Sequence, residues 1–248
     1  MGTKEPKVKV QNLTKKFGDL LVLNNLNFEV QEGEFLCIVG PTGCGKTTFL
    51  NSLTRLYEPT AGEILVNGIP VNPKKQNISY IFQEYSSFPW LTVEQNIRFG
   101  LEIKKMPKAE ADANVEEMLD IVGLTKFRNY YPSQLSISML QRVAIARAFA
   151  TKPELLLMDE PYGQLDIDLR FKLEDELIKL WQKTGTTVLF ITHNIEEAVY
   201  VSENILVLTN KPTTIKSRVE NHLARPRTVT AREFIDVREH VTELIKWW

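Results

Sequence analysis

The chain has 248 residues, of which 43% are hydrophobic and 25% are charged, as in an ordinary globular protein long enough to bury its own core. Its 30 lysines and arginines balance its 31 aspartates and glutamates, so no basic surface marks nucleic acid as a partner. Its two cysteines, Cys37 and Cys44, are too close in sequence for a disulfide framework, and free thiols fit a reducing cytosol.

The first eighty or so residues alternate between strands and one glycine-rich segment. Residues 35–39 form a continuous apolar run, which is typical of a strand covered on both faces. The glycine-rich segment follows at once, and residues 47–56 then have helical character. Strand patterns in this part of the chain cover residues 8–10, 26–30, 35–39, 64–66 and 78–82.

The middle of the chain is helical. Apolar residues recur at helical spacing between Ala111 and Val122, and Gly123 stands where a helix C-cap is expected. We therefore predict a helical subdomain of about 84–152, inserted into a core of about 1–83 and 153–222.

The core then resumes. Its strands alternate with helices, which predicts an α/β fold with a mostly parallel sheet. The apolar strand runs cover residues 155–158, 188–191 and 205–208. A C-terminal tail of about 223–248 is expected to end in a helix with one apolar face, formed by Phe234, Val237, Val241, Leu244 and Trp248.

The sequence shows no candidate membrane segment. The longest apolar runs have the length of strands, so we expect no transmembrane helix. The first ten residues lack the apolar stretch of a signal peptide. Any membrane association is therefore expected to come through a partner.

The glycine-rich segment matches the phosphate-binding pattern G-x-x-x-x-G-K-[ST] between an expected strand and an expected helix. Its glycines let backbone N–H groups close around phosphate oxygens, and the helix points its positive end at the same charge. Lys46 is expected to reach the β- and γ-phosphates, and Thr47 to offer its hydroxyl to Mg²⁺. A chance glycine-rich turn would lack this strand–loop–helix context. The expected ATP-binding residues are Gly40, Pro41, Thr42, Gly43, Cys44, Gly45, Lys46, Thr47 and the following Thr48.

Two acids end the apolar run of residues 155–158. A strand buried on both faces delivers its last residues to the edge of the sheet where ligands bind. Asp159 is there to hold Mg²⁺, directly or through water, and Glu160 to act as general base on the attacking water. An ordinary strand followed by an acidic turn is the alternative, which the upstream phosphate loop disfavours.

In order and spacing, these motifs resemble those of the ATP-binding cassette (ABC) ATPases over most of the chain. Three further residues resemble loop residues of that family: Gln83 the Q-loop glutamine, Asp166 the D-loop aspartate and His193 the switch histidine. Phe17 resembles the aromatic residue of the A-loop, and Ser136 stands in the place of the signature motif. The resemblance therefore covers six motifs and the A-loop residue.

The resemblance implies a role for each residue. Gln83 would contact Mg²⁺ or the attacking water, and His193 would contact the γ-phosphate and stabilise the charge that develops in transfer. Phe17 would stack on adenine, Ser136 would cover the γ-phosphate bound by the opposite subunit, and Asp166 would belong to the nucleotide site. The alternatives are a satisfied polar residue for His193, a core residue for Phe17 and a helix N-cap for Asp166.

The resemblance also implies the architecture and the partners. The expected fold is that of a P-loop NTPase of the ABC ATPase type, with a RecA-like parallel-sheet core, an N-terminal antiparallel β region and an inserted α-helical subdomain. In the family, two ATPase subunits, identical or related, clamp two Mg-ATP head to tail and drive transmembrane permease subunits. The chain is thus expected at the cytoplasmic face of the membrane, held there by the permease, with a periplasmic or extracellular binding protein acting indirectly.

A closer resemblance is carried by the segments 88–96, 196–200 and 224–227. They are similar to the ATPase subunits of importers for nitrate, sulfonate, taurine and related small ligands. In that family, the segment around Pro89-Trp90 receives a coupling helix of the permease. Alternatively, Trp90 and Leu91 pack the helical subdomain.

The signature motif departs from the family pattern. The family reads Leu-Ser-Gly-Gly-Gln, whereas this chain has no glycine in the run from Leu135 to Met139, where the third residue is the β-branched Ile137. Either the change is tolerated in a working site, or the partner's ATP is hydrolysed slowly and the chain belongs to an asymmetric pair. Restoring glycines at Ile137 and Ser138 tests this.

A second departure is Cys44, which replaces a commoner serine in the phosphate loop. A thiol beside Lys46 and a helix N-terminus is expected to have a lowered pKa. We therefore expect thiol reagents to inhibit the protein and ATP to protect it.

Three other functions compete with an importer ATPase. A soluble ABC ATPase acting on DNA or ribosomes usually carries coiled coils, tandem cassettes or basic extensions, which this chain lacks. A regulatory module that holds ATP without useful turnover would fit the altered signature. An exporter subunit is disfavoured by the Pro89-Trp90 segment, by family analogy alone.

Overall fold

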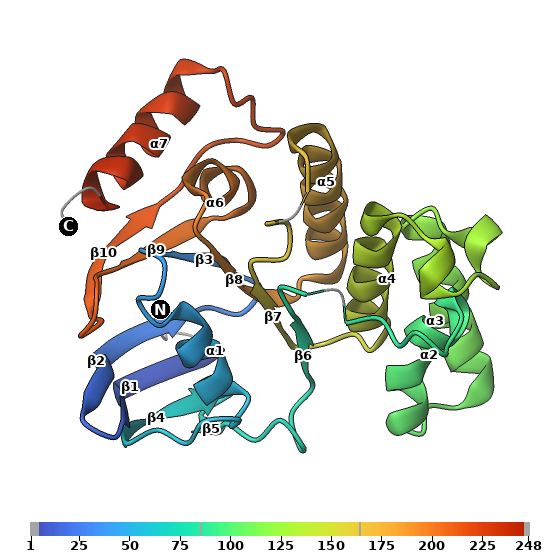
Figure 1. Ribbon diagram of the computed structural model, residues 1–248, viewed down its shortest axis with the longest axis horizontal. Coiled ribbons are helices and arrows are strands. Elements are labelled where there is room, and N and C mark those ends of the chain that lie inside the picture. The colour runs from blue at the N-terminus through green and yellow to red at the C-terminus, as the bar shows by residue number, and fades with distance from the viewer. Residues whose placement is uncertain (1–4, 85, 164, 246–248) are drawn as a thin grey trace. The chain divides into compact units, whose positions relative to one another are not determined.

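A computed structural model describes residues 5–84, 86–163 and 165–245, which fall into two compact units (Figure 1). The first unit holds the chain up to Gln76 and again from Thr187 onward, and the second holds the residues from Asn77 to Thr186. Trp248, which we assigned to the apolar face of the last helix, lies outside the described residues.

The first unit begins with an antiparallel sheet, as expected for the N-terminal region. β1 and β2 form a hairpin in which Phe17 pairs with Leu20 across a two-residue turn, and Gly18 there has a φ of 57°. β4 pairs with the other edge of β1, so the strand order is β2-β1-β4-β5. The four strands are β1 (Val8–Phe17), β2 (Leu20–Val30), β4 (Ala61–Val66) and β5 (Ile69–Pro70).

The remaining strands of the first unit form the parallel sheet that the apolar runs predict. β3 lies between β8 and β9 and is parallel to both, and β10 adds an antiparallel edge. β3 and β8 are buried along their whole length, because the sheet is covered on both faces. The strands are β3 (Phe35–Val39), β8 (Thr187–Thr192), β9 (Asn204–Leu208) and β10 (Ile215–Glu220).

Three helices complete the first unit. α1 (Lys46–Leu53) follows β3 after the glycine-rich loop, and α6 (Ile195–Val201) follows β8. α7 (Arg232–Ile245) packs beside α6 and buries Phe234 and Val241 (Figure 1). α7 thereby covers α6 with the apolar face of the tail.

The second unit joins two strands to four helices. β6 (Ile78–Ile81) and β7 (Leu155–Asp159) are parallel, with Ile81 in register with Met158. α4 contacts β6 and all three other helices of this unit. The helices are α2 (Val93–Ile103), α3 (Lys108–Ile121), α4 (Ile137–Ala150) and α5 (Ile167–Thr184), with single 3₁₀ turns at Thr125–Phe127 and Pro132–Gln134.

The ends of these helices follow ordinary capping rules. Thr92 begins α2 with a capping box, accepting from the Gln95 backbone N–H while its own N–H donates to the Gln95 side chain. Gly185 ends α5 with a φ of 64°, which glycine adopts without strain. Within the described ranges, none of the helices has both the length and the apolar character needed to cross a membrane.

Candidate functional site

The glycine-rich loop connects the carboxyl end of β3 to the first turn of α1 in the first unit. Gly45 is the N-cap of α1 and has a φ of 115°, so it offers no side chain to the helix N-terminus. A Cβ at Gly45 would lie 2.8 Å from Cγ1 of Val22, so the close approach of β2 also requires glycine here. No acid occupies the first turn of α1, which leaves its N-terminal N–H groups suited to an anion.

The Lys46 side chain folds back over this loop. Its Nζ donates to the carbonyl oxygens of Gly40 at 2.9 Å and Pro41 at 3.2 Å, and only 5% of the residue is exposed. Thr47 is exposed at the same end of the helix. The positive charge of Lys46 and the exposed Thr47 thus lie where the sequence predicts phosphate and Mg²⁺ to bind.

Thr213 supports the loop from the turn between β9 and β10. Its hydroxyl donates to the Cys44 carbonyl, its N–H donates to Val22 at 2.9 Å, and its carbonyl accepts from Asn24 at 2.9 Å. The residue is completely buried. Nothing in the sequence indicates this role, because a threonine 169 positions from Cys44 carries no local signal.

The prediction for the Cys44 thiol is wrong. Cys44 is only 1% exposed, and burial raises the pKa of its thiol even though the positive charge of Lys46 acts in the opposite direction. A buried thiol with a raised pKa is a poor nucleophile. We therefore no longer expect rapid alkylation at Cys44.

His193 leaves the sheet at the same edge as the phosphate loop. β3 and β8 are parallel, and Val39 is in register with Thr192, so Gly40 and His193 follow paired residues. His193 is exposed. The next residue, Asn194, is the N-cap of α6 and accepts from the Glu197 backbone N–H at 3.2 Å. Parallel strands place ligand-binding residues at this carboxyl edge, so the fold brings His193 and the loop to one edge of the first unit.

Phe17 lies at the end of β1 and is 41% exposed, so it is not a core phenylalanine. Its ring meets Tyr57 edge to face, with centroids 5.2 Å apart, and the Lys15 ammonium lies 4.8 Å from its centroid. The exposure leaves ring surface available for stacking. The contact with Tyr57 has no signal in the sequence, because the two residues lie forty positions apart.

In the second unit, Asp159 ends β7 and is 4% exposed. The Tyr80 hydroxyl donates to its Oδ2 at 3.2 Å. Burial, followed by the charge of Asp159 and the hydrogen bond to it, raises the pKa of Tyr80 far above its usual range. Tyr80 thus donates to the predicted metal-binding acid, a contact that the sequence did not indicate.

Glu160 follows directly, with a φ of 44° in the left-handed region, and its carbonyl accepts from the Gly163 N–H at 3.2 Å. A non-glycine residue held in this region stores strain of about 1–3 kcal/mol, and such residues cluster at functional sites. Ile81 is in register with Met158. The exposed Gln83 comes two residues after Ile81, and Asp159 comes one residue after Met158. Gln83, Asp159 and Glu160 thus share the carboxyl edge of the second unit.

Ser136 and Asp166 are both helix N-caps in this structure. Oγ of Ser136 accepts from the Met139 N–H at 3.4 Å, and Oδ1 of Asp166 accepts from the Leu169 N–H at 2.9 Å. Asp166 therefore makes the hydrogen bond of a helix N-cap, which was the alternative to its role in the nucleotide site. Ile137 is the first residue of α4 and is 51% exposed. The signature segment thus presents a β-branched side chain at a helix N-terminus.

The predicted residues divide between the units. Phe17, Gly40 to Thr48 and His193 belong to the first, and the others belong to the second: Gln83, Ser136, Asp159, Glu160 and Asp166. The donors proposed for Mg²⁺ are a hydroxyl, an amide and a carboxylate oxygen, which suit a hard cation that takes its other ligands from phosphate and water. Among the described residues, no cluster of three His, Cys, Asp or Glu side chains could hold a metal alone.

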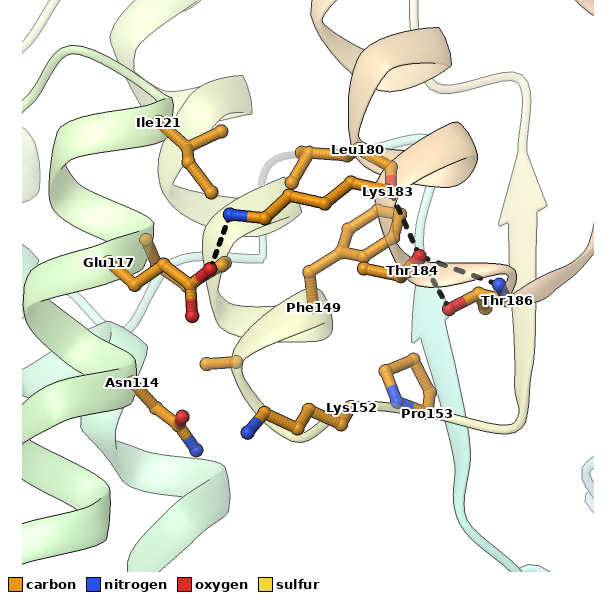
Figure 2. Close-up of a pocket in the computed structure, with 12 residues that line it drawn as sticks. Asn114, Glu117, Ile121, Phe149, Lys152, Pro153, Leu180, Lys183, Thr184 and Thr186 are labelled. Carbon is orange, nitrogen blue, oxygen red and sulfur yellow. Dashed lines mark hydrogen bonds and ion pairs between the residues drawn. The ribbon is translucent and has the colours of Figure 1, made fainter.

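A cavity of about 320 Å³ lies between α3, α4 and α5 in the second unit (Figure 2). Its walls include Phe149 and Leu180, and Lys183 reaches Glu117 at 2.5 Å along one side. None of the predicted site residues lines it. It is therefore distinct from the proposed nucleotide site.

Known proteins resemble this chain over most of its length. The ABC transporter family profile matches residues 23–163. An uncharacterized ABC transporter ATP-binding protein of Methanocaldococcus jannaschii is 45% identical over 244 residues, which are 97% of this chain and 91% of the relative. The aliphatic sulfonates import ATP-binding protein SsuB of Bacillus thuringiensis subsp. konkukian is 40% identical over 230 residues, covering 93% of this chain and 90% of the relative.

Solved structures agree with these relatives. A dimeric ATP-binding cassette in a post-hydrolysis state, bound to ADP and phosphate, matches with a TM-score of 0.76 and 34% identity over 88% of this chain and all of that one. The cbiO1 protein of Clostridium perfringens, part of the ABC transporter complex cbiONQ, matches in fold with a TM-score of 0.80 at 23% identity, over 97% of this chain and 98% of that one. The chain therefore has the ABC ATPase cassette fold and belongs to the ABC transporter family as an ATP-binding protein.

Proposed function

We propose that this ABC ATPase hydrolyses Mg-ATP to power an importer for a small anionic or zwitterionic ligand of the nitrate, sulfonate and taurine class. The observation that carries the ATPase proposal is the loop from Gly40 to Thr47, whose Lys46 ammonium and uncapped α1 N-terminus favour phosphate at the strand edge that also carries His193. The importer class is supported by full-length relatives named as aliphatic sulfonate import proteins, at about 40% identity.

The mechanism assigns one task to each group. The loop N–H groups and Lys46 bind the phosphates, and Phe17 stacks on the base. Glu160 orients the attacking water and accepts its proton, and His193 stabilises charge on the transferring phosphoryl group. Thr47, Asp159 and Gln83 would hold Mg²⁺, which would supply positive charge to the site.

A second ATPase subunit would complete each site. A related cassette is dimeric with ADP and phosphate bound. In such a pair, the α4 N-terminus with Ser136 would face the nucleotide held by the opposite subunit. Both an identical and a related partner fit this arrangement.

Permease subunits are the other proposed partners. A groove of about 250 Å³ in the second unit is walled by Phe88, Phe99 and Ile103, and Trp90 beside it is 69% exposed. Asn96, which is completely buried, fixes this segment by accepting from the Phe88 N–H at 2.8 Å and donating to the Leu91 carbonyl at 3.0 Å. A rigid groove beside an exposed tryptophan suits a permease helix, so the chain would lie at the cytoplasmic face of the membrane. A substrate-binding protein on the other face would act indirectly.

Co-purification with the permease and a ligand-stimulated ATPase assay test the proposal. Glu160→Gln should still bind ATP but lose turnover by at least about a hundredfold, as expected for loss of a general base. Asp168→Asn, which removes an exposed acid in the first turn of α5, is the matched control and should keep wild-type turnover. Wild-type turnover in Glu160→Gln would refute the catalytic assignment. An ATPase rate of the assembled transporter that no sulfonate, taurine or nitrate ligand stimulates would refute the importer class.

A second function has one observation in its favour. Ile137 exposes half of its surface at the start of α4, where the family has glycine. A stiff side chain there would hinder close approach to a phosphate, so the chain would serve as the weaker half of an asymmetric pair. Single-turnover hydrolysis at each site of the assembled pair distinguishes the two functions.

A further inference from the structure

The two-turn helix α6 is fastened at its C-terminal end by side chains from the segment 221–227, which we call the tail brace. Arg227 Nη1 donates to the carbonyls of Val199, Tyr200 and Ser202 at 2.7, 3.0 and 2.6 Å. Further hydrogen bonds to this end of α6 run from Arg225 to the Tyr200 and Val201 carbonyls, and from Asn221 to the Val199 and Ser202 carbonyls. The carbonyls that a helix leaves without partners at its C-terminus are thus taken up by the tail.

The brace places two guanidinium groups at the negative end of the helix dipole. Arg227 is 8% exposed, and burial, with the neighbouring charge of Arg225, lowers its pKa to about 10. It is therefore still protonated at neutral pH. A charge this buried is costly unless it is hydrogen-bonded, and Arg227 donates from Nη1 to the carbonyls at the end of α6 and from Nε to the Leu223 carbonyl at 3.2 Å. The C-terminal end of α6 is consequently held in place by hydrogen bonds from the tail brace.

The tail also holds the other end of α6. α7 packs against α6 (Figure 1). Nη1 of Arg238 lies 3.6 Å from Oε2 of Glu196 in the first turn of α6. This ion pair is partly exposed and contributes little by itself. The apolar contacts of α7 and the brace together leave α6 little freedom to shift.

α6 begins immediately after His193. Asn194 caps the helix, and no loop separates that cap from His193. Seven residues of helix span about 10 Å, so a shift at the braced end moves the capped end with it. We infer that Arg225 and Arg227 are positioning residues that hold His193 against the γ-phosphate by fixing α6. This inference rests on the proposed role of His193 in ATP hydrolysis.

The test uses the full-length chain with Mg-ATP and measures kcat, nucleotide affinity and thermal stability. Arg227→Ala should lower kcat by about 10- to 100-fold, since small misplacements of a catalytic group have effects of this size. Affinity for a fluorescent ATP analogue should stay within about twofold, because the phosphate loop is untouched. Arg227→Lys, which keeps a cation with three donors, should recover most of the lost kcat.

A double-mutant cycle separates positioning from general loss of stability. In a His193→Ala background, Arg227→Ala should cause no further loss of kcat, because both changes remove the same interaction. Arg232→Ala is the control, since it removes an 83% exposed arginine of the same tail and should leave kcat unchanged. If Arg227→Ala does not fold, Arg225→Ala, which removes the hydrogen bonds to Tyr200 and Val201, carries the same comparison.

Each outcome decides one point. Unchanged kcat in Arg227→Ala, or an equal loss in both backgrounds, overturns the positioning role while leaving the proposed function intact. A parallel loss of kcat and nucleotide affinity also overturns it, because the brace would then act on the whole fold. If His193→Ala itself keeps full kcat, the proposed role of His193 fails and the inference fails with it.

Discussion

The Tyr80 hydroxyl donates a hydrogen bond to Oδ2 of Asp159 across the parallel pair β6 and β7. Tyr80 also lines the groove that we propose for the permease. One side chain thus contacts both the predicted metal-binding acid and the wall of a partner site within the second unit.

Removing that hydroxyl should destabilise the protein. Tyr80→Phe leaves the 4% exposed Asp159 without this donor, which is expected to cost about 1–3 kcal/mol in the free energy of unfolding. Urea denaturation measures the change. Tyr130→Phe is the control, because Tyr130 is 42% exposed and water is available to its hydroxyl. Equal stability of wild type and Tyr80→Phe would contradict the hydrogen bond.

The same variant should alter alkaline unfolding. The pKa of Tyr80 is raised in the folded state, mainly by burial and then by Asp159, so the unfolded state loses this proton first. Stability is therefore fully present below the unfolded pKa near 10 and falls above it, with a slope of up to about 1.4 kcal/mol per pH unit. Tyr80→Phe should show a shallower fall above that pH. Identical slopes would mean that Tyr80 titrates normally.

Thiol chemistry should be slow. Cys37 and Cys44 are both buried, and burial raises the pKa of the Cys44 thiol. We expect the folded protein to react with a disulfide reagent at neutral pH far more slowly than the urea-unfolded chain, which should react at both thiols. A Cys37→Ser variant assigns the residual rate to Cys44. Rapid labelling that abolishes ATPase and is prevented by ATP would restore the expectation drawn from the sequence.

Gly45 should be more sensitive to substitution than a glycine with similar backbone geometry elsewhere. Gly45→Ala meets both a φ of 115° and a contact of 2.8 Å with Val22, and is expected to cost about 2–4 kcal/mol. Gly185→Ala, at a φ of 64° in open space, should cost about 1–2 kcal/mol. Thermal unfolding compares the two variants, and equal costs would show that β2 yields to the extra methyl group.

Restoring the signature glycines should raise turnover if Ile137 weakens the site. We expect Ile137→Gly with Ser138→Gly to increase the ATPase rate of the assembled transporter, at a cost of up to about 1 kcal/mol per glycine in α4. The comparison is made at equal amounts of assembled complex. An unchanged rate would show that the altered signature is tolerated.

Local sequence patterns predicted much of the fold. The apolar run of residues 35–39 became the buried strand β3, and the glycine–lysine–threonine pattern became a strand–loop–helix unit, because both depend on neighbouring residues. The antiparallel region and the parallel core were also predicted correctly. The boundaries of the helical subdomain and the roles of the site residues stay predictions.

Contacts between residues far apart in the chain could not be predicted from the sequence. The hydrogen bond from Thr213 to Cys44 joins residues 169 positions apart, and that from Tyr80 to Asp159 joins residues 79 apart. The Cys44 prediction failed because the local sequence does not show that the thiol is buried, and burial raises its pKa. The local sequence identifies Cys44 as a thiol beside a lysine, but its reactivity depends on burial in the packed fold.

Ser136 gives its helix an acceptor without giving it a charge. Its oxygen accepts from the Met139 N–H at 3.4 Å, and its hydroxyl hydrogen is a donor that Ser138, 3.0 Å away, or another oxygen can take. An aspartate would begin α4 equally well, yet it would repel an approaching anion. A neutral N-cap therefore leaves this helix end able to bind a polyphosphate. The substitution Ser136→Asp would preserve the helix but weaken the binding of that anion.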